Sequence, residues 1–176
     1  MLSVDVADFV AETQSPGLWT FLMKAITVRS VIDVGCGRGI STKWFLDHGA
    51  DVSVHTFLLV QLCETAACCM LTVAGYLFRL CVEGSNDAIA KSYLPKDRIV
   101  AHDFSLGPYW PEKTYDMAWC VEVLEHVARP YMKNYQTIFH KAAIIVASHS
   151  VWGGHHHVEV HPDWWWVVRM ELAGFM

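Results

Sequence analysis

Basic residues are sparse in this sequence, and nowhere do they cluster. The 176 residues include 13 Lys and Arg against 18 Asp and Glu, which gives a formal net charge of −5. A protein that binds a nucleic-acid backbone needs a concentration of positive charge to neutralise phosphates. The charge pattern therefore predicts no nucleic-acid partner.

The sequence also lacks two other signals. The N-terminus has no basic flank and apolar core of a secretory type, since the first lysine is Lys24, and we expect a cytoplasmic protein. The cysteines show no C-x-x-C spacing, which favours reduced, buried thiols over a disulfide framework or a zinc site. These cysteines are Cys36, Cys63, Cys68, Cys69, Cys81 and Cys120.

Short β-branched or apolar runs alternate with helical patterns along most of the chain. Strands are expected at 30–34, 80–83, 98–101, 115–120 and 142–147, and helices at 41–46, 85–92 and 163–173, after two short ones within 4–26. Such alternation predicts an α/β fold with a doubly wound, mostly parallel sheet covered on both faces. The length suits a single domain over residues 1–176.

A glycine turn follows the first predicted strand. Gly35, Gly37 and Gly39 lack a Cβ, so the backbone can bend sharply and bring bare N–H groups close to a ligand at a helix start. A dinucleotide-binding turn would place a third small residue at position 40, where this chain has Ile40. The spacing therefore argues against NAD.

With Asp33 in the strand, residues 31–39 (VIDVGCGRG) resemble motif I of class I S-adenosylmethionine-dependent methyltransferases. Residues 82–85 (VEGS), 101–104 (AHDF) and 115–127 (YDMAWCVEVLEHV) resemble later motifs of that family in the expected order. The last string is similar to the small-molecule, type 11-like branch. The resemblance covers about residues 28–150 and implies a Rossmann-like fold.

The same resemblance implies S-adenosyl-L-methionine as cofactor and a small molecule as methyl acceptor. In the family, an acid after the second strand accepts both ribose hydroxyls, a role that matches Glu83. An acid after the third strand accepts the adenine amino group while an apolar neighbour covers the ring, which matches Asp103 and Phe104. The candidate cofactor-binding residues are Asp33, Gly35, Cys36, Gly37, Gly39, Glu83, Asp103, Phe104, Cys120 and Glu122.

His126 is the candidate catalytic residue. It lies in the V-L-E-H-V string, where we expect the start of a helix near the transferred methyl group. Its imidazole could take a proton from the acceptor, although the family often uses this histidine structurally. Methyl transfer depends mainly on alignment, so a catalytic residue is not required.

Residues 53–79 interrupt the resemblance. Without these 27 residues Glu83 falls 21 positions after Gly35, close to the offset of about 20 for a ribose-binding acid. We therefore predict an insertion in the second strand, either a real helical segment or a translated intron. Its uncharged run, 65–78, is shorter than the about 20 residues that cross a bilayer, so no membrane partner is expected.

The last part of the sequence is rich in histidine and tryptophan. In an extended chain His155, His157, Glu159 and His161 would share one face and could ligate a metal. The other interpretation is a surface loop above the methyl-donor pocket, and we assign no metal ligand. Residues 164–166, three tryptophans, are expected to pack a final helix that Asp163 caps and Gly174 ends.

The sequence ends before the antiparallel hairpin with which the family sheet usually closes. We therefore expect a truncated sheet without its last two strands. A non-catalytic cofactor-binding remnant is accordingly an alternative to an active methyltransferase, and a metal-dependent enzyme built on the 155–161 cluster is another. The sequence predicts neither the acceptor nor the oligomeric state.

Overall fold

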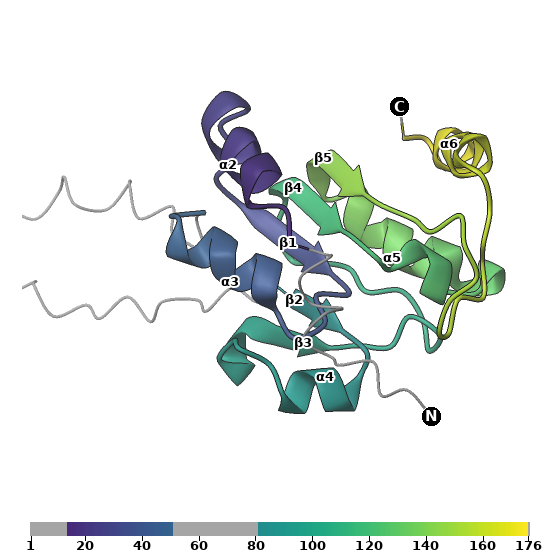
Figure 1. The fold of residues 1–176 in the computed structure, drawn as a ribbon, viewed down its shortest axis with the longest axis horizontal. Coiled ribbons are helices and arrows are strands. Elements are labelled where there is room, and N and C mark those ends of the chain that lie inside the picture. The colour runs from purple at the N-terminus through teal and green to yellow at the C-terminus, as the bar shows by residue number, and fades with distance from the viewer. Residues whose placement is uncertain (1–13, 51–80, 176) are drawn as a thin grey trace, which may run out of the picture.

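Five parallel strands form the centre of the structure, a computed structural model that describes residues 14–50 and 81–175 (Figure 1). Their order, β3-β2-β1-β4-β5, changes direction beside β1, as in a doubly wound sheet. All four pairings are parallel, which confirms the predicted fold class. The strands are β1 (Val31–Val34), β2 (Cys81–Glu83), β3 (Ile99–Ala101), β4 (Tyr115–Cys120) and β5 (Ala142–Ala147).

Helices cover both faces of this sheet. They are α2 (Pro16–Ala25), α3 (Ile40–Asp47), α4 (Asn86–Ala90), α5 (Met132–Phe139) and α6 (Asp163–Leu172). Helices α2 and α3 pack on one face, and α5 and α6 on the other (Figure 1). Neighbouring residues of β4 alternate between the two cores, since Met117 and Trp119 join the first and Ala118 and Cys120 the second. Burial on both faces explains why the strands read as continuous apolar runs.

Two helix starts differ from the expectation. His126 lies in a separate 3-10 turn, Leu124–His126, and α5 begins only at Met132. Pro162 holds the N-cap position of α6, so Asp163 is its first residue, where a negative charge still suits the helix dipole. The predicted end is confirmed, because Gly174 has a φ of +89°.

The tryptophans of α6 do not all pack inward. Trp166 is buried in the core, as expected, whereas Trp164 is 66% exposed. Trp165 lies between these extremes and stacks on His161, with ring centroids 3.7 Å apart. The prediction therefore holds fully for Trp166 and in part for Trp165, which packs against the same core while partly buried.

The predicted insertion, residues 53–79, and the first of the two N-terminal helices lie outside the described residues. Directly after that gap, β2 pairs with β1 through Asp33 with Cys81 and Val34 with Val82. Glu83 therefore stands at the carboxyl end of the strand beside the glycine turn. None of the described helices is long and apolar enough to cross a membrane.

One expectation about the cysteines is wrong. Cys36 and Cys81 form a disulfide, with their Cα atoms 5.6 Å apart. Sheet pairing brings β2 next to the glycine turn, so two cysteines 45 positions apart in the sequence become neighbours. Cys120 is a buried free thiol, as expected.

Candidate functional site

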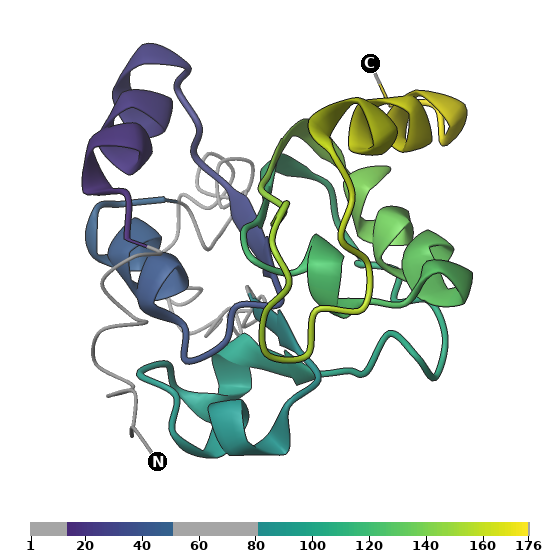
Figure 2. The same ribbon diagram turned by 45° about the vertical axis from the view of Figure 1, so that its right-hand side comes forward.

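A cavity of about 570 Å³ opens at the carboxyl ends of the strands. This volume falls within the range of about 300–1,000 Å³ that is usual for small-molecule sites. Its walls come from the loops that follow β1, β2, β3 and β4, with Val158 from the segment between β5 and α6. Figure 2 shows that segment running beside the loop after β4. The position is the one at which doubly wound sheets bind ligands.

The glycine turn forms one wall of the cavity. Gly35, Gly37 and Gly39 have φ values of +67°, +55° and +79°, which favour glycine. A Cβ at Gly35 would lie 2.5 Å from Val123, so packing also requires glycine there. A Cβ at Gly37 would meet no described atom within 4 Å, and Gly37 lines the cavity. The backbone at Gly37 is therefore open to a ligand.

Asp33 supports this turn from beneath and does not line the cavity. Its Oδ2 accepts hydrogen bonds of 2.6 Å from both Ser41 Oγ and Thr42 Oγ1, at the start of α3. Burial raises the pKa of Asp33 to about 6, despite these hydrogen bonds. We had expected a cofactor contact, but the carboxylate instead ties β1 to α3 and positions the turn between them.

Six of the ten candidate cofactor residues line the cavity, and four do not. The six are Gly35, Gly37, Glu83, Asp103, Phe104 and Glu122. Besides Asp33, the three that lie outside the lining are Cys36, Gly39 and Cys120. Cys36 is in the disulfide, Gly39 caps α3, and Cys120 is fully buried in β4.

Glu83 presents a fixed carboxylate at the end of β2. Its Oε2 accepts a 2.7 Å hydrogen bond from Gly37 N–H, and its Oε1 accepts one of 2.7 Å from Ser85 N–H. Burial raises the pKa of Glu83, and the backbone donors at Ser85 and Gly37 oppose that shift. A carboxylate offers about four acceptor positions. It therefore retains capacity for two hydroxyl donors on the cavity side.

Asp103 and Phe104 make a polar and an apolar wall after β3. Asp103 is exposed, and a hydrogen bond from Ser105 N–H lowers its pKa. Phe104 is buried, and its carbonyl accepts a 2.6 Å hydrogen bond from Asn134 Nδ2, which anchors the loop on α5. An acceptor group beside an aromatic surface suits a planar heterocycle that carries an amino group.

The wall after β4 contains Glu122 and His126. Glu122 has a φ of +57°, a conformation that is rare for a non-glycine residue and concentrates at functional sites. Its Oε1 accepts a 2.9 Å hydrogen bond from Ser148 Oγ, at the end of β5. His126 is exposed, and its Nδ1 lies 3.1 Å from the carbonyl oxygen of His156. The predicted catalytic histidine thus reaches the cavity.

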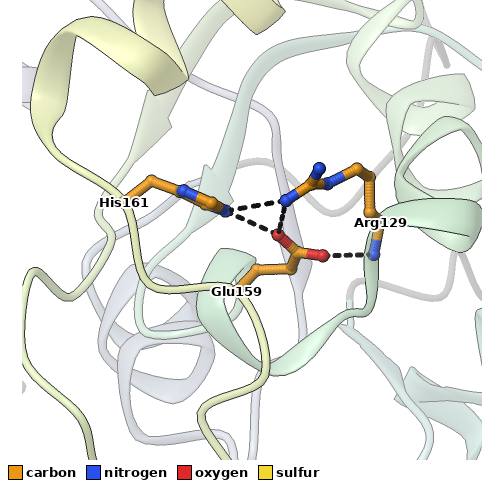
Figure 3. A network of polar contacts seen from close by, with 3 residues as sticks. All are labelled: Arg129, Glu159 and His161. Carbon is orange, nitrogen blue, oxygen red and sulfur yellow. Dashed lines mark hydrogen bonds and ion pairs between the residues drawn. The ribbon is translucent and has the colours of Figure 1, made fainter.

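The four side chains that would share one face of an extended tail do not come together as a metal site. His156 has a φ of +59°, so the chain turns there and the alternation of an extended strand is lost. Glu159 instead accepts hydrogen bonds from Arg129 N–H (2.9 Å) and Nη2 (3.1 Å), and it lies 2.6 Å from His161 Nε2 (Figure 3). Burial raises the pKa of Glu159, but these partners outweigh it and the pKa is lowered. Both oxygens of this carboxylate therefore already have partners within the protein.

Sequence comparison finds no match, either among protein-family models or among curated proteins. Among solved structures, the methyltransferase domain of bacterial CtHen1 matches with a TM-score of 0.56 at 17% identity, over 93% of this chain and 83% of that one. A SAM-dependent methyltransferase from Archaeoglobus fulgidus matches with a TM-score of 0.54 at 16% identity, over 92% and 69%.

A third solved structure contains a cofactor product. The plantazolicin methyltransferase BpumL, in complex with a pentazolic desmethylPZN analog and SAH, matches with a TM-score of 0.53 at 13% identity, over 98% of this chain and 65% of that one. Together with the strand order, these similarities show that the chain has the fold of class I S-adenosylmethionine-dependent methyltransferases.

Proposed function

We propose that this protein binds S-adenosylmethionine in the cavity beyond β1–β4 and transfers its methyl group to a small molecule. The observation that carries the proposal is the Glu83 carboxylate, buried and oriented by Gly37 N–H and Ser85 N–H on the cavity wall. A carboxylate fixed by two donors is suited to two adjacent ribose hydroxyls, which are donors at a constant separation.

The other wall residues fit the rest of this cofactor. Asp103 can accept from the adenine amino group, and Phe104 offers an apolar edge for the ring. The open backbone at Gly37 leaves room for the part that joins ribose to sulfur. When bound, the cofactor supplies a methyl group on a positively charged sulfonium. Glu122, on the wall after β4, is an acidic residue whose charge is complementary to that sulfonium.

Within this proposal the chain acts mainly by alignment. The turn, Glu83 and Asp103 hold the donor, and an acceptor enters beside His126 and Val158. A carbonyl oxygen cannot donate, so the contact with His156 O places the proton of neutral His126 on Nδ1. Its Nε2 then has a free lone pair and could take a proton from the acceptor.

A small acceptor and a cytoplasmic location both stay predictions. The net charge of −5 disfavours a nucleic-acid acceptor, and BpumL is a plantazolicin methyltransferase with the same fold. The alternative function is a protein that binds the cofactor without turnover. The two functions differ only in whether the methyl group of S-adenosylmethionine is transferred to an acceptor.

Isothermal titration of the purified full chain with S-adenosylhomocysteine tests the cofactor assignment, with NADH as the comparison ligand. We expect one S-adenosylhomocysteine per chain and no heat from NADH. A folded sample that binds NADH alone, or neither ligand, would contradict the proposal. Transfer of the labelled methyl group to members of a small-molecule panel would then separate the methyltransferase from the non-catalytic alternative.

A further inference from the structure

Three metal-ligating side chains meet at the edge of the cavity, outside the groups that hold the proposed cofactor. Glu125 and His126 come from the 3-10 turn after β4, and His157 comes from the segment between β5 and α6. One ligand atom of each lies within 4.8 Å of the others. The two imidazole rings stand edge to face, with centroids 4.8 Å apart.

Both histidines have a ring nitrogen free to bind a cation. His126 Nδ1 lies 3.1 Å from His156 O, and His157 Nδ1 lies 2.8 Å from Trp152 O. Because a carbonyl oxygen only accepts, each neutral ring carries its proton on Nδ1 and keeps the lone pair on Nε2. Histidines that ligate metals typically donate the N–H of the other ring nitrogen to an oxygen in this way, and that bond orients the ring.

Glu125 provides an independent indication. Its side chain is 0% exposed, and neither carboxylate oxygen has a hydrogen-bond partner among the described residues. A buried carboxylate without partners is strongly disfavoured unless a cation or donor compensates it. Among the described residues, the ring nitrogens of His126 and His157 share its surroundings. A positive ion between the three groups would satisfy the carboxylate.

The backbone holds these residues together without any help from an ion. Val158 N–H and Glu159 N–H donate hydrogen bonds of 2.8 and 3.0 Å to the carbonyl oxygen of Glu125. These bonds attach the segment that carries His157 to the turn that carries His126. Behind it, Glu159 is fixed by Arg129 and His161, so the attachment is anchored on both sides (Figure 3).

We propose that Glu125, His126 and His157 bind one divalent metal ion. Two imidazoles and one carboxylate are a ligand set for divalent transition metals and leave coordination positions open. Ligands about 2.1 Å from an ion stand roughly 3–3.5 Å apart, so the side chains would close by roughly 1–2 Å. Since His126 lines the cavity, the open positions would adjoin the space for the methyl acceptor. With the ion bound, the Nε2 lone pair of His126 is a metal ligand and no longer the proton acceptor considered above.

The test uses the untagged full chain, stripped of metal by a chelator, and Mn²⁺ as the probe. Mn²⁺ is chosen because cysteine thiols outside the disulfide would compete for a softer ion such as Zn²⁺. Electron paramagnetic resonance reports the free Mn²⁺ that remains at each point of a titration. We expect one Mn²⁺ bound per chain, and affinity reduced on the order of 100-fold in both Glu125→Gln and His157→Asn.

The matched control is His155→Asn, which changes an exposed histidine of the same segment outside the cluster. It should bind Mn²⁺ as the wild type does. The proposal is overturned if the wild type binds no Mn²⁺, if Glu125→Gln retains wild-type affinity, or if His155→Asn is weakened as much as His157→Asn. Circular dichroism shows whether the variants are folded. If they are not, the number of Mn²⁺ ions bound per wild-type chain decides the test by itself. S-adenosylhomocysteine titration is a separate measurement, so failure of one proposal leaves the other assessable.

Discussion

Replacing Gly37 with alanine should abolish tight cofactor binding while the fold persists. The φ of +55° costs an L-residue about 1–2 kcal/mol, and the added methyl group meets no described atom within 4 Å. Gly37 lines the cavity, so this methyl group would stand where a ligand must approach the backbone. Loss of ligand contacts along this wall worth about 2–3 kcal/mol corresponds to about 30- to 160-fold weaker binding.

Gly49 provides the matched control. Its φ is +79°, a Cβ there would also meet no described atom within 4 Å, and it lies beyond the end of α3 rather than on the cavity wall. Both variants should therefore lower the melting temperature by about 2–8 °C. In titrations with S-adenosylhomocysteine, Gly49→Ala should match the wild type. Wild-type affinity in Gly37→Ala, or an equal loss in both variants, would refute the placement of the cofactor.

Three other outcomes concern carboxylates. Glu83→Gln should weaken S-adenosylhomocysteine binding about 10- to 100-fold, because it removes charge-assisted hydrogen bonds worth about 1.5–3 kcal/mol. The control, Glu171→Gln, changes an exposed residue and should leave the affinity unchanged. Equal affinities of the two variants by calorimetry would exclude the ribose role of Glu83. The pKa of Asp33 is about 6 in the folded chain, above its ordinary 3.8. The contribution of this group to the free energy of unfolding is therefore complete below about pH 3.8 and is lost as the pH rises through about 6. Urea unfolding at pH 4.5 and 7 should show a larger loss in the wild type than in Asp33→Asn, in which Glu83 still has a raised pKa, and equal pH dependence would contradict this assignment. Glu159→Gln should lower the free energy of unfolding by about 1–3 kcal/mol, because Arg129 loses its charged acceptor, and an unchanged urea midpoint would argue against the network in Figure 3.

The strands and the glycine turn could be predicted because their determinants are local. A strand that is buried on both faces is a short apolar run, and the turn requires glycine wherever φ is positive. The start of α5 could not be placed so well, because polar residues occupy its inner face. Asn134 and Thr137 are buried there and donate to the carbonyl oxygens of Phe104 and Tyr109, partners that only the folded chain provides.

The direction in which side chains point could not be predicted from the sequence, and this limited the prediction of site residues. Spacing led to Glu83 once residues 53–79 were set aside, and the structure has it on the cavity wall. Asp33 belongs to the same motif, but its carboxylate turns to Ser41 and Thr42 instead. Adjacency in a motif therefore located the turn without telling which side chains reach the ligand.

The side-chain neighbours in the histidine-rich tail could not be predicted for a related reason. The metal-binding interpretation, which we did not adopt, assumed an extended backbone, and one positive φ at His156 redistributes the side chains. His157 then joins Glu125 and His126, a neighbourhood that no spacing in the sequence indicates. The pairing of Cys36 with Cys81 likewise depends on the register between two strands.

A crystal structure of the full chain with S-adenosylhomocysteine tests the central claim most directly. We predict the ribose hydroxyls within hydrogen-bond distance of Glu83, the adenine beside Asp103 and Phe104, and the sulfur directed toward the wall of Glu122 and His126. Ligand density elsewhere on the molecule, with the cavity beyond β1–β4 free of it, would contradict the account.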